Sequence, residues 1–234
     1  MFHKIFINNG LASVYERTFR LETNHLQEGF ELTEEQIKLI ENMNPAFFER
    51  HMESSSPGEL LSQDIKVVGT LSGIGRIYAH CVVDTFGSYA CAFLHTNKIP
   101  EAAVAVLHNE VLPQYKERGI KVQTVLSDNG REFCGREGHP YELYCALNEI
   151  EHRTTQIRRL QTNGFVERFI RTLKADFIGV AFMKKIYTSI EELQEKLDSW
   201  LYHYNYERPH RGYINMGKRP FETVTGFVES QKER

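Results

Sequence analysis

Cysteine is scarce in this chain: its 234 residues include only four, and none are spaced as CxxC. This scarcity excludes a small secreted scaffold held together by disulfides. Cys81 and Cys91 fall in apolar, strand-like runs, where a thiol behaves as a small hydrophobic side chain. The other cysteines and their neighbouring histidines are too irregularly spaced to favour a zinc site over buried thiols and surface histidines. The residues that such a zinc site would use are Cys134, His139, Cys145 and His152.

Long hydrophobic runs are also absent. No apolar run approaches the ~20 residues of a membrane span, which excludes a membrane protein. Residues 1–10 are too short and too polar for a secretory signal, so we expect a cytoplasmic protein. Hydrophobic residues still make up 41% of the chain, which is enough to bury a substantial core.

A strongly positive charge, expected of a DNA-binding protein, is missing as well, because the formal net charge is −3. The distribution of charge is more informative. Residues 1–64 contain 11 acidic and 5 basic residues, whereas residues 65–234 contain 20 acidic and 23 basic residues. Local basic clusters of this kind can bind backbone phosphates. The cluster comprises Arg153, Arg158, Arg159, Arg168, Arg171 and Lys174.

Three carboxylates stand where metal-assisted chemistry needs them. Asp64 lies in a strand-like run, Asp128 ends a second such run, and Glu167 lies one turn into an amphipathic helix. Mg²⁺ prefers carboxylate oxygens together with water and phosphate oxygens. Two strand-borne Asp residues and one helix-borne Glu therefore indicate metal-dependent phosphodiester chemistry. Spacing alone does not establish the site, because 31 acidic residues allow many triples.

Each of the three acids has a simpler interpretation. Asp64 is a solvated residue if its strand is an exposed edge. Asp128 forms an Asx turn with the following Asn-Gly, an arrangement that is compatible with metal binding. Glu167 pairs with Arg171 across one helical turn, a contact worth only tenths of a kcal/mol.

Two further acids lie close to these positions in the sequence. Asp84 ends the next strand and is an alternative first ligand if hairpin pairing places it diagonally across from Asp64. A role in stabilising the turn is favoured for Asp84. Glu132 follows the turn after Asp128 and is expected at the surface.

The spacing of apolar residues predicts an α/β fold, with three antiparallel strands followed by β-α-β units in one mixed sheet. Strands are expected at residues 61–69, 76–84, 88–96, 122–127 and 152–156. Helices are expected at residues 100–118, 141–149 and 162–180, and from a capping box at Ser189 to Pro209.

The N-terminal part is predicted to be a small helical appendage. Helices are expected at residues 13–27 and from residue 33, and the Ser-Pro-Gly-rich residues 54–58 are interpreted as a linker. The predicted organisation is an appendage at 1–58, a catalytic core with its C-terminal helix at 59–225, and a tail at 226–234.

Three segments carry a resemblance to a known family. They are Leu-Ser-Asp-Asn-Gly-Arg-Glu-Phe at 126–133, Gln-Thr-Asn-Gly-Phe-Val-Glu-Arg at 161–168, and Tyr-Asn-Tyr-Glu-Arg-Pro-His-Arg-Gly at 204–212. They resemble the second-acid segment, the third-acid helix and the C-terminal segment of insertion-sequence transposases with a retroviral-integrase-like core. The 38 residues between Asp128 and Glu167 fit the D,D,E arrangement of that family.

The resemblance implies a ribonuclease-H-like fold, a mixed five-stranded sheet flanked by helices, in which the first and fourth strands are neighbours. It implies a DDE-type polynucleotidyl transferase that cleaves DNA ends and joins them to target DNA. Asp64, Asp128 and Glu167 are then the catalytic residues and the ligands of Mg²⁺ or Mn²⁺, with two ions expected. DNA and further copies of the chain are the expected partners. The residues expected to contact DNA are Arg158, Arg159, Arg168, Arg171, Lys174, Arg208 and Arg211.

The chain also departs from the family pattern. The resemblance begins near residue 14, so the usual N-terminal helix-turn-helix region is expected to be missing. Leu160 stands where the family has proline, and Ile65 and Ser72 replace a more usual Thr and Lys. A catalytically idle transposase remnant that dimerises or binds DNA nonspecifically is therefore an alternative. A ribonuclease-H-like nuclease is a weaker one, because fold does not fix function.

Overall fold

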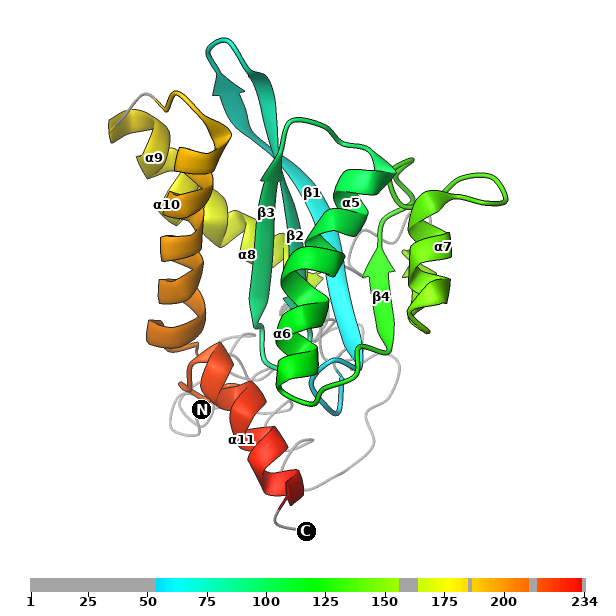
Figure 1. The fold of residues 1–234 in the computed structure, drawn as a ribbon. Helices are drawn as coiled ribbons and strands as arrows, with labels where there is room; N and C mark the ends of the chain where they lie inside the picture. Colours follow the sequence, from blue (N-terminus) through cyan, green and yellow to red (C-terminus); the bar gives the residue numbers. More distant parts are fainter. Residues whose placement is uncertain (1–53, 156–163, 185–186, 211–213, 233–234) are drawn as a thin grey trace, which may run out of the picture. The chain divides into compact units, whose positions relative to one another are not determined.

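The computed structural model describes residues 54–155, 164–184, 187–210 and 214–232 (Figure 1). These residues belong to one unit of the chain, Met52–Arg234. The helices predicted at 13–27 and from residue 33 lie outside the described residues. Within the described ranges, no helix is both long enough and apolar enough to cross a membrane.

A mixed five-stranded sheet in the order β3-β2-β1-β4-β5 forms the centre of this unit (Figure 1). The first three strands form an antiparallel meander, and β4 runs parallel to both β1 and β5. This topology confirms the predicted mixed sheet and the pairing of the first strand with the fourth. The strands are β1 (Leu60–Leu71), β2 (Gly75–Asp84), β3 (Ala90–His95), β4 (Thr124–Ser127) and β5 (Glu151–Thr154).

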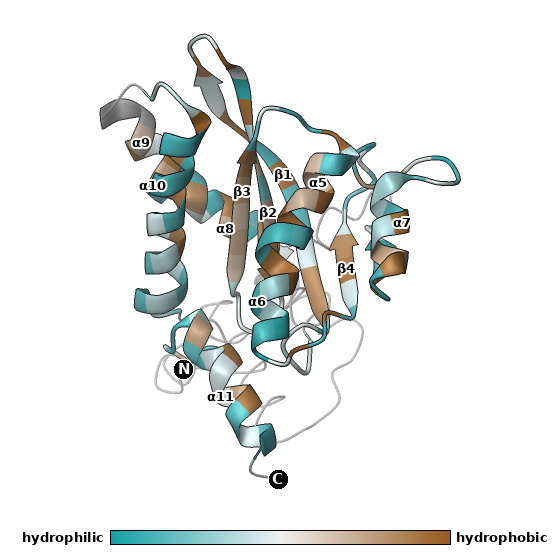
Figure 2. Cartoon of the chain, in the orientation of Figure 1, coloured by the Kyte–Doolittle hydropathy of each residue, from teal (hydrophilic) through white to brown (hydrophobic). Residues whose placement is uncertain are grey.

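Helices cover both faces of the sheet. On one face, α5 (Pro100–Val106) continues through a π-helical turn (Leu107–Val111) into α6 (Leu112–Glu117), and α7 (Pro140–Leu147) lies beside them (Figure 1). The first three segments together form the helix predicted at 100–118. Strands β2, β3 and β4, which lie between the helical layers, are mostly hydrophobic (Figure 2).

The other face is covered by the helices that follow β5. Helix α8 (Gly164–Thr172) continues through a π-helical turn (Leu173–Ile178) into α9 (Gly179–Lys184). Helix α10 (Ile190–Tyr202) ends in a further π-helical turn (His203–Glu207) and packs beside β3. These helices and strands β1, β2 and β3 enclose one of two hydrophobic cores, and the other core lies on the opposite face, beneath α5, α6 and α7.

The capping box predicted at the start of α10 is present in part. The Ser189 hydroxyl accepts a hydrogen bond from the backbone N–H of Glu192 at 3.2 Å. The Glu192 carboxylate in turn accepts from the backbone N–H of Thr188 at 3.4 Å, one residue before the predicted donor. Ser189 is therefore the N-cap that the sequence predicted.

Residues 54–58 pack against the core unit, so the prediction of a linker there is wrong. The Ser54 hydroxyl lies 2.6 Å from that of Thr85, and the backbone N–H of Gly58 donates to Asp84 at 2.9 Å. Gly58 has φ +79°, and a Cβ there would lie 2.7 Å from the Lys121 carbonyl oxygen. Glycine is therefore required for a close packing contact rather than for an open linker.

Helix α11 (Pro220–Lys232) was not predicted and crosses the expected boundary between core and tail at residue 225. Phe227, in the predicted tail, packs edge-on against Phe86 with ring centroids 5.1 Å apart. Val224 lies in the same hydrophobic core as β1 and α5. The sequence lacks a strong apolar stripe at this helix, so tertiary packing defines it more than periodicity does.

Candidate active site

Asp64 in β1 and Asp128, which directly follows β4, come from neighbouring strands of the sheet. In the parallel pairing of β1 with β4, the last paired residues are Ser62 and Leu126. Asp64 and Asp128 each lie two residues beyond this pair. The charge of Asp128 also acts on Asp64, so the two carboxyl groups are close enough to interact. The sheet thus brings together the two strand-borne acids predicted from the sequence.

Asp64 is half-buried, and its surroundings disfavour a bare negative charge. Burial raises the pKa of Asp64 to about 6, and the charge of Asp128 contributes in the same direction. A hydrogen bond from the backbone N–H of Ile65 to Oδ1, at 2.7 Å, opposes this rise, as do the charges of Lys66 and Lys98. Two carboxylates that share a partly buried position form a favourable place for a cation.

Asp128 shapes the turn in which it lies. Its Oδ1 accepts a hydrogen bond from the backbone N–H of Gly130 at 2.9 Å, as in the predicted Asx turn. Within the described residues, only this one carboxylate oxygen is hydrogen-bonded, so the other oxygen can serve as a ligand. The structural and the metal-binding interpretations of Asp128 are therefore compatible.

Lys98 and Glu132 form an ion pair beside these acids that the sequence analysis did not identify. The Lys98 Nζ lies 2.7 Å from the Glu132 carboxylate. Glu132 is only 5% exposed, so its predicted surface position is wrong. Burial alone would lower the pKa of Lys98, but Glu132, Asp128 and Asp64 together raise it. Lys98 therefore neutralises Glu132 and partly offsets the negative charge of the two aspartates.

Glu167 lies on α8, the helix that packs against β1 and β2. Asp64 pairs with Cys81, and Cys81 belongs to the hydrophobic core that α8 covers, so Asp64 is on the face of the sheet that carries this helix. The amphipathic character predicted for this helix is confirmed: Glu167 is exposed, whereas Phe169 is buried and Phe165 is partly buried. The buried residues of α8 and its π-helical turn are Val166, Phe169, Ile170, Leu173 and Phe177.

Asp84 does not share a face with Asp64. Asp64 pairs with Cys81, three residues before Asp84, so the alternation of side chains directs the two aspartates to opposite faces. The Asp84 carboxylate is fully buried and accepts hydrogen bonds from Gly58, Phe86 and Tyr115. The favoured role in stabilising the turn is thus confirmed, and the diagonal pairing with Asp64 is wrong.

The basic residues predicted to contact DNA are only partly described. Arg158, Arg159 and Arg211 lie outside the described residues. Arg168, Arg171 and Lys174 are exposed on α8 and its π-helical turn.

Arg208 differs from Arg171 and Lys174 in having an acidic partner. It forms an ion pair with Asp176 at 2.6 Å and lines a cavity of about 350 Å³ together with Arg168. The charge of Arg208 is thus balanced locally, whereas no ion pair involving Arg171 or Lys174 occurs within the described part of the chain.

Family comparison agrees with this geometry. Two models, each described as an integrase core domain, match residues 54–159 and 148–216, which together span more than half of the chain. The chain belongs to the integrase core family. The first matched region contains both Asp64 and Asp128, and the second contains Glu167.

Relatives of this integrase core include viral and insertion-element proteins. The ORF3 protein of Spiroplasma virus SpV1-C74, which carries the name of an integrase, is 26% identical over 182 residues, or 73% of this chain and 48% of that protein. An insertion element IS136 protein of Agrobacterium fabrum is 28% identical over 96 residues, or 41% of this chain and 46% of that protein. The chain thus spans about half the length of the curated relatives it matches.

Solved structures share the fold of this integrase core. The HTLV-2 integrase catalytic core domain, solved in complex with magnesium, superimposes with a TM-score of 0.56 at 16% identity. The match covers 74% of this chain and 99% of that domain. The ribonuclease-H-like fold implied by the sequence resemblance is thereby confirmed.

Replacing Asp64 with asparagine is expected to stabilise this integrase core in metal-free buffer near pH 8. The folded-state pKa of about 6 exceeds the ordinary value of 3.8, so the wild type loses stability as pH rises through about 6. The free energy of unfolding is expected to be on the order of 2 kcal/mol higher in the variant at pH 8, and this difference should vanish below about pH 4. Urea unfolding in EDTA at pH 4 and at pH 8 measures the difference. An equal difference between variant and wild type at pH 4 and pH 8 would contradict the assigned environment of Asp64.

Proposed function

We propose that this integrase core is the catalytic part of a DNA transposase of the DDE type, which cleaves DNA ends and transfers the strands to target DNA. The observation that carries the proposal is the electrostatic contact of Asp64 with Asp128, with Asp64 on the face of the sheet covered by the helix of Glu167. Membership of the integrase core family supports it. The insertion-element relative points to transposition as the setting.

The side chains of the site fit a divalent metal ion. Asp64, Asp128 and Glu167 supply only carboxylate oxygens, the donors that Mg²⁺ and Mn²⁺ prefer. Burial and the charge of Asp128 raise the pKa of Asp64, so a cation between the two carboxyl groups relieves an unfavourable interaction. A related catalytic core was solved with magnesium, which is consistent with this choice of ion.

Each residue has a distinct role in the proposed reaction. Bound ions, two in our proposal, would activate the attacking oxygen and neutralise the leaving oxygen of the phosphodiester. The turn held by the Asp128 carboxylate keeps that ligand in place before substrate arrives. Glu167 contributes the third carboxylate from the exposed side of α8. Lys98, which is paired with Glu132, offsets part of the negative charge of the two aspartates.

The exposed side of α8 is proposed to bind the DNA backbone next to the reacting phosphate. Arg171 and Lys174 lie one and two turns beyond Glu167 on the same side of the helix. Both are exposed and are positioned to contact phosphates. Arg208 is assigned a smaller part, because its charge is balanced by Asp176.

The double variant Arg171→Ala, Lys174→Ala is expected to bind DNA more weakly and with a smaller salt dependence. Each lost phosphate contact lowers the slope of log K against log salt by about 1, so the expected change is about 2. Fluorescence anisotropy with a labelled duplex at several salt concentrations measures it. Lys232→Ala, at the exposed end of α11, is the control. An unchanged slope in the double variant would place the DNA elsewhere.

A catalytically idle remnant is the second candidate. The departures at Ile65, Ser72 and Leu160 favour it, whereas the retention of all three acids favours an active enzyme. A nicked or branched DNA substrate, incubated with the full chain and increasing Mg²⁺ or Mn²⁺, separates the two. Metal-dependent cleavage or joining that is lost in Glu167→Gln supports the enzyme. A folded, DNA-binding protein without activity at any metal concentration supports the remnant. We also propose that the active enzyme is a homo-oligomer, as the family resemblance implies. Sedimentation of the full chain with and without DNA tests whether it self-associates.

A further inference from the structure

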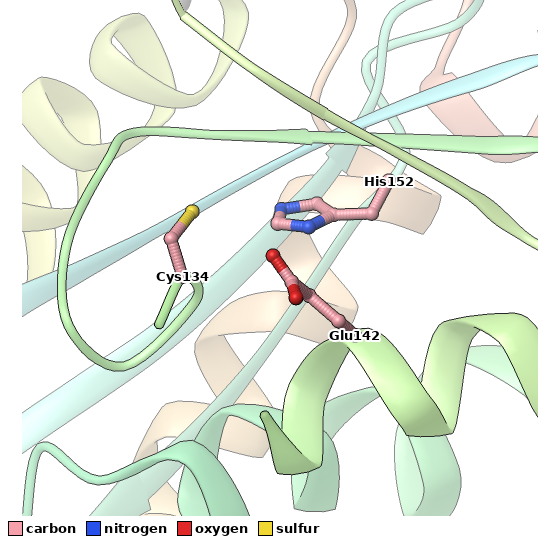
Figure 3. A group of neighbouring side chains, drawn as sticks. All are labelled: Cys134, Glu142 and His152. Atoms are coloured by element: carbon pink, nitrogen blue, oxygen red, sulfur yellow. The ribbon is translucent and has the colours of Figure 1, made fainter. Parts of the chain in front are cut away.

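Cys134, Glu142 and His152 form a second cluster of possible metal ligands. His152 pairs with Val125, which belongs to one hydrophobic core, whereas Asp64 pairs with Cys81, which belongs to the core on the other face of the sheet. Each residue of the cluster offers one ligand atom, and these atoms all lie within 4.8 Å of one another. The three side chains point toward one another from a loop, from the first turn of α7 and from β5 (Figure 3). Of the four residues considered from the sequence, Cys134 and His152 meet, whereas Cys145 is outside the cluster and Glu142 was missed.

Neighbouring groups orient the His152 ring. The Ser127 hydroxyl lies 2.9 Å from the Asp128 carbonyl oxygen, to which it can donate. The same hydroxyl lies 2.8 Å from His152 Nε2. When the hydroxyl donates to the carbonyl, it accepts from Nε2–H, and Nδ1 keeps the free lone pair. Metal-binding histidines are commonly held in this way, with the second ring nitrogen donating to an oxygen.

The donors differ in kind from those of the Asp64 site. A thiol, an imidazole and a carboxylate form a set that suits Zn²⁺, whereas Mg²⁺ prefers oxygen alone. A buried packing contact between the three side chains is a poor alternative, because Glu142 is exposed and the other two are only half-buried.

A second histidine supports the same interpretation. Nε2 of His139 lies 3.0 Å from the Arg131 carbonyl oxygen. Its buried Nδ1 has no hydrogen-bond partner within the described residues. His139 also acts electrostatically on His152, so the two rings are near each other. His139 is therefore a candidate for a further ligand beside the cluster.

We propose that Cys134, Glu142 and His152 bind a zinc-type divalent cation, with the fourth position open to water or to His139. The site joins the loop at residues 128–139 to α7 and β5. Cys134 Sγ also lies 3.9 Å from the Asp128 carbonyl oxygen. A metal held here fixes the loop that carries Asp128, and so links zinc binding to the geometry of the proposed active site.

Cobalt titration of the full chain under reducing conditions tests the proposal. Co²⁺ replaces Zn²⁺ in such sites, and its bond to a thiolate gives a near-ultraviolet charge-transfer band that oxygen ligands do not produce. The band is expected to saturate at one Co²⁺ per chain and to disappear when Zn²⁺ is added. It should be lost in Cys134→Ser and weakened in Glu142→Gln. Ser127→Ala, which loosens His152, should lower the affinity roughly tenfold.

Two controls separate this site from the rest of the chain. Cys145→Ala removes a buried thiol three residues from Glu142 and should keep the band. Asp64→Asn should also keep it, so the result is independent of the proposed Mg²⁺ site. Circular dichroism verifies folding of each variant. The absence of a band in the wild type, its persistence in Cys134→Ser, or its loss in a folded Cys145→Ala variant would overturn the proposal.

Discussion

Mg²⁺-dependent nicking of DNA is expected to fall roughly 1,000-fold or more when Asp128 is replaced by asparagine. Loss of a carboxylate that binds metal removes several kcal/mol of transition-state stabilisation, and about 4 kcal/mol corresponds to this factor. The amide oxygen of asparagine can still accept the hydrogen bond from Gly130. The variant should therefore retain the turn and the fold while it loses the ligand.

A nicking assay with supercoiled plasmid DNA across a range of Mg²⁺ concentrations measures this loss. Asp198→Asn, an equivalent change at an exposed position on α10, is the matched control and should leave the rate unchanged. Thermal unfolding verifies that both variants fold. Nicking by Asp128→Asn at the wild-type rate would refute the assignment of this residue.

Asp84→Ala is expected to destabilise the fold by about 3 kcal/mol without changing metal affinity. The Asp84 carboxylate accepts hydrogen bonds from the backbone N–H groups of Gly58 and Phe86, at 2.9 and 2.8 Å, and from the Tyr115 hydroxyl at 2.8 Å. Burial raises the pKa of Asp84 to about 6, so the charge itself carries a cost near neutral pH. Alanine removes that cost but leaves three donors without an acceptor.

Urea unfolding at pH 7, with Mg²⁺ binding measured in parallel, tests this role. Asp84→Asn keeps one acceptor oxygen and should lose less stability than Asp84→Ala. A loss of Mg²⁺ affinity with unchanged stability would instead identify Asp84 as a ligand, which the register of β1 with β2 argues against.

Local patterns were sufficient to predict most of the fold. Strand-like apolar runs between turn residues located the strands, and the helical stripe at 100–118 located α5 and α6. The spacing of Ser189 and Glu192 predicted the start of α10, because capping depends on neighbours in the sequence. The family resemblance supplied the strand order, which periodicity alone does not determine.

Features that depend on distant partners were not predictable. Glu132 follows a turn and is charged, yet Lys98, 34 residues earlier, allows it to be buried. Gly58 looks like part of a linker until its contact with Lys121 is known. Glu142 has no special spacing from Cys134 or His152, and only the packing of α7 against β5 brings it to them.

In the proposed active site, three carboxylates from separate segments hold divalent cations together. Crystals of the core grown with Mn²⁺ test it directly, because anomalous scattering locates the ions independently of the protein atoms. Manganese is expected between Asp64 and Asp128, within coordination distance of Glu167. Manganese at other positions only, or none at saturating concentration with the three carboxylates far apart, would contradict the proposed active site.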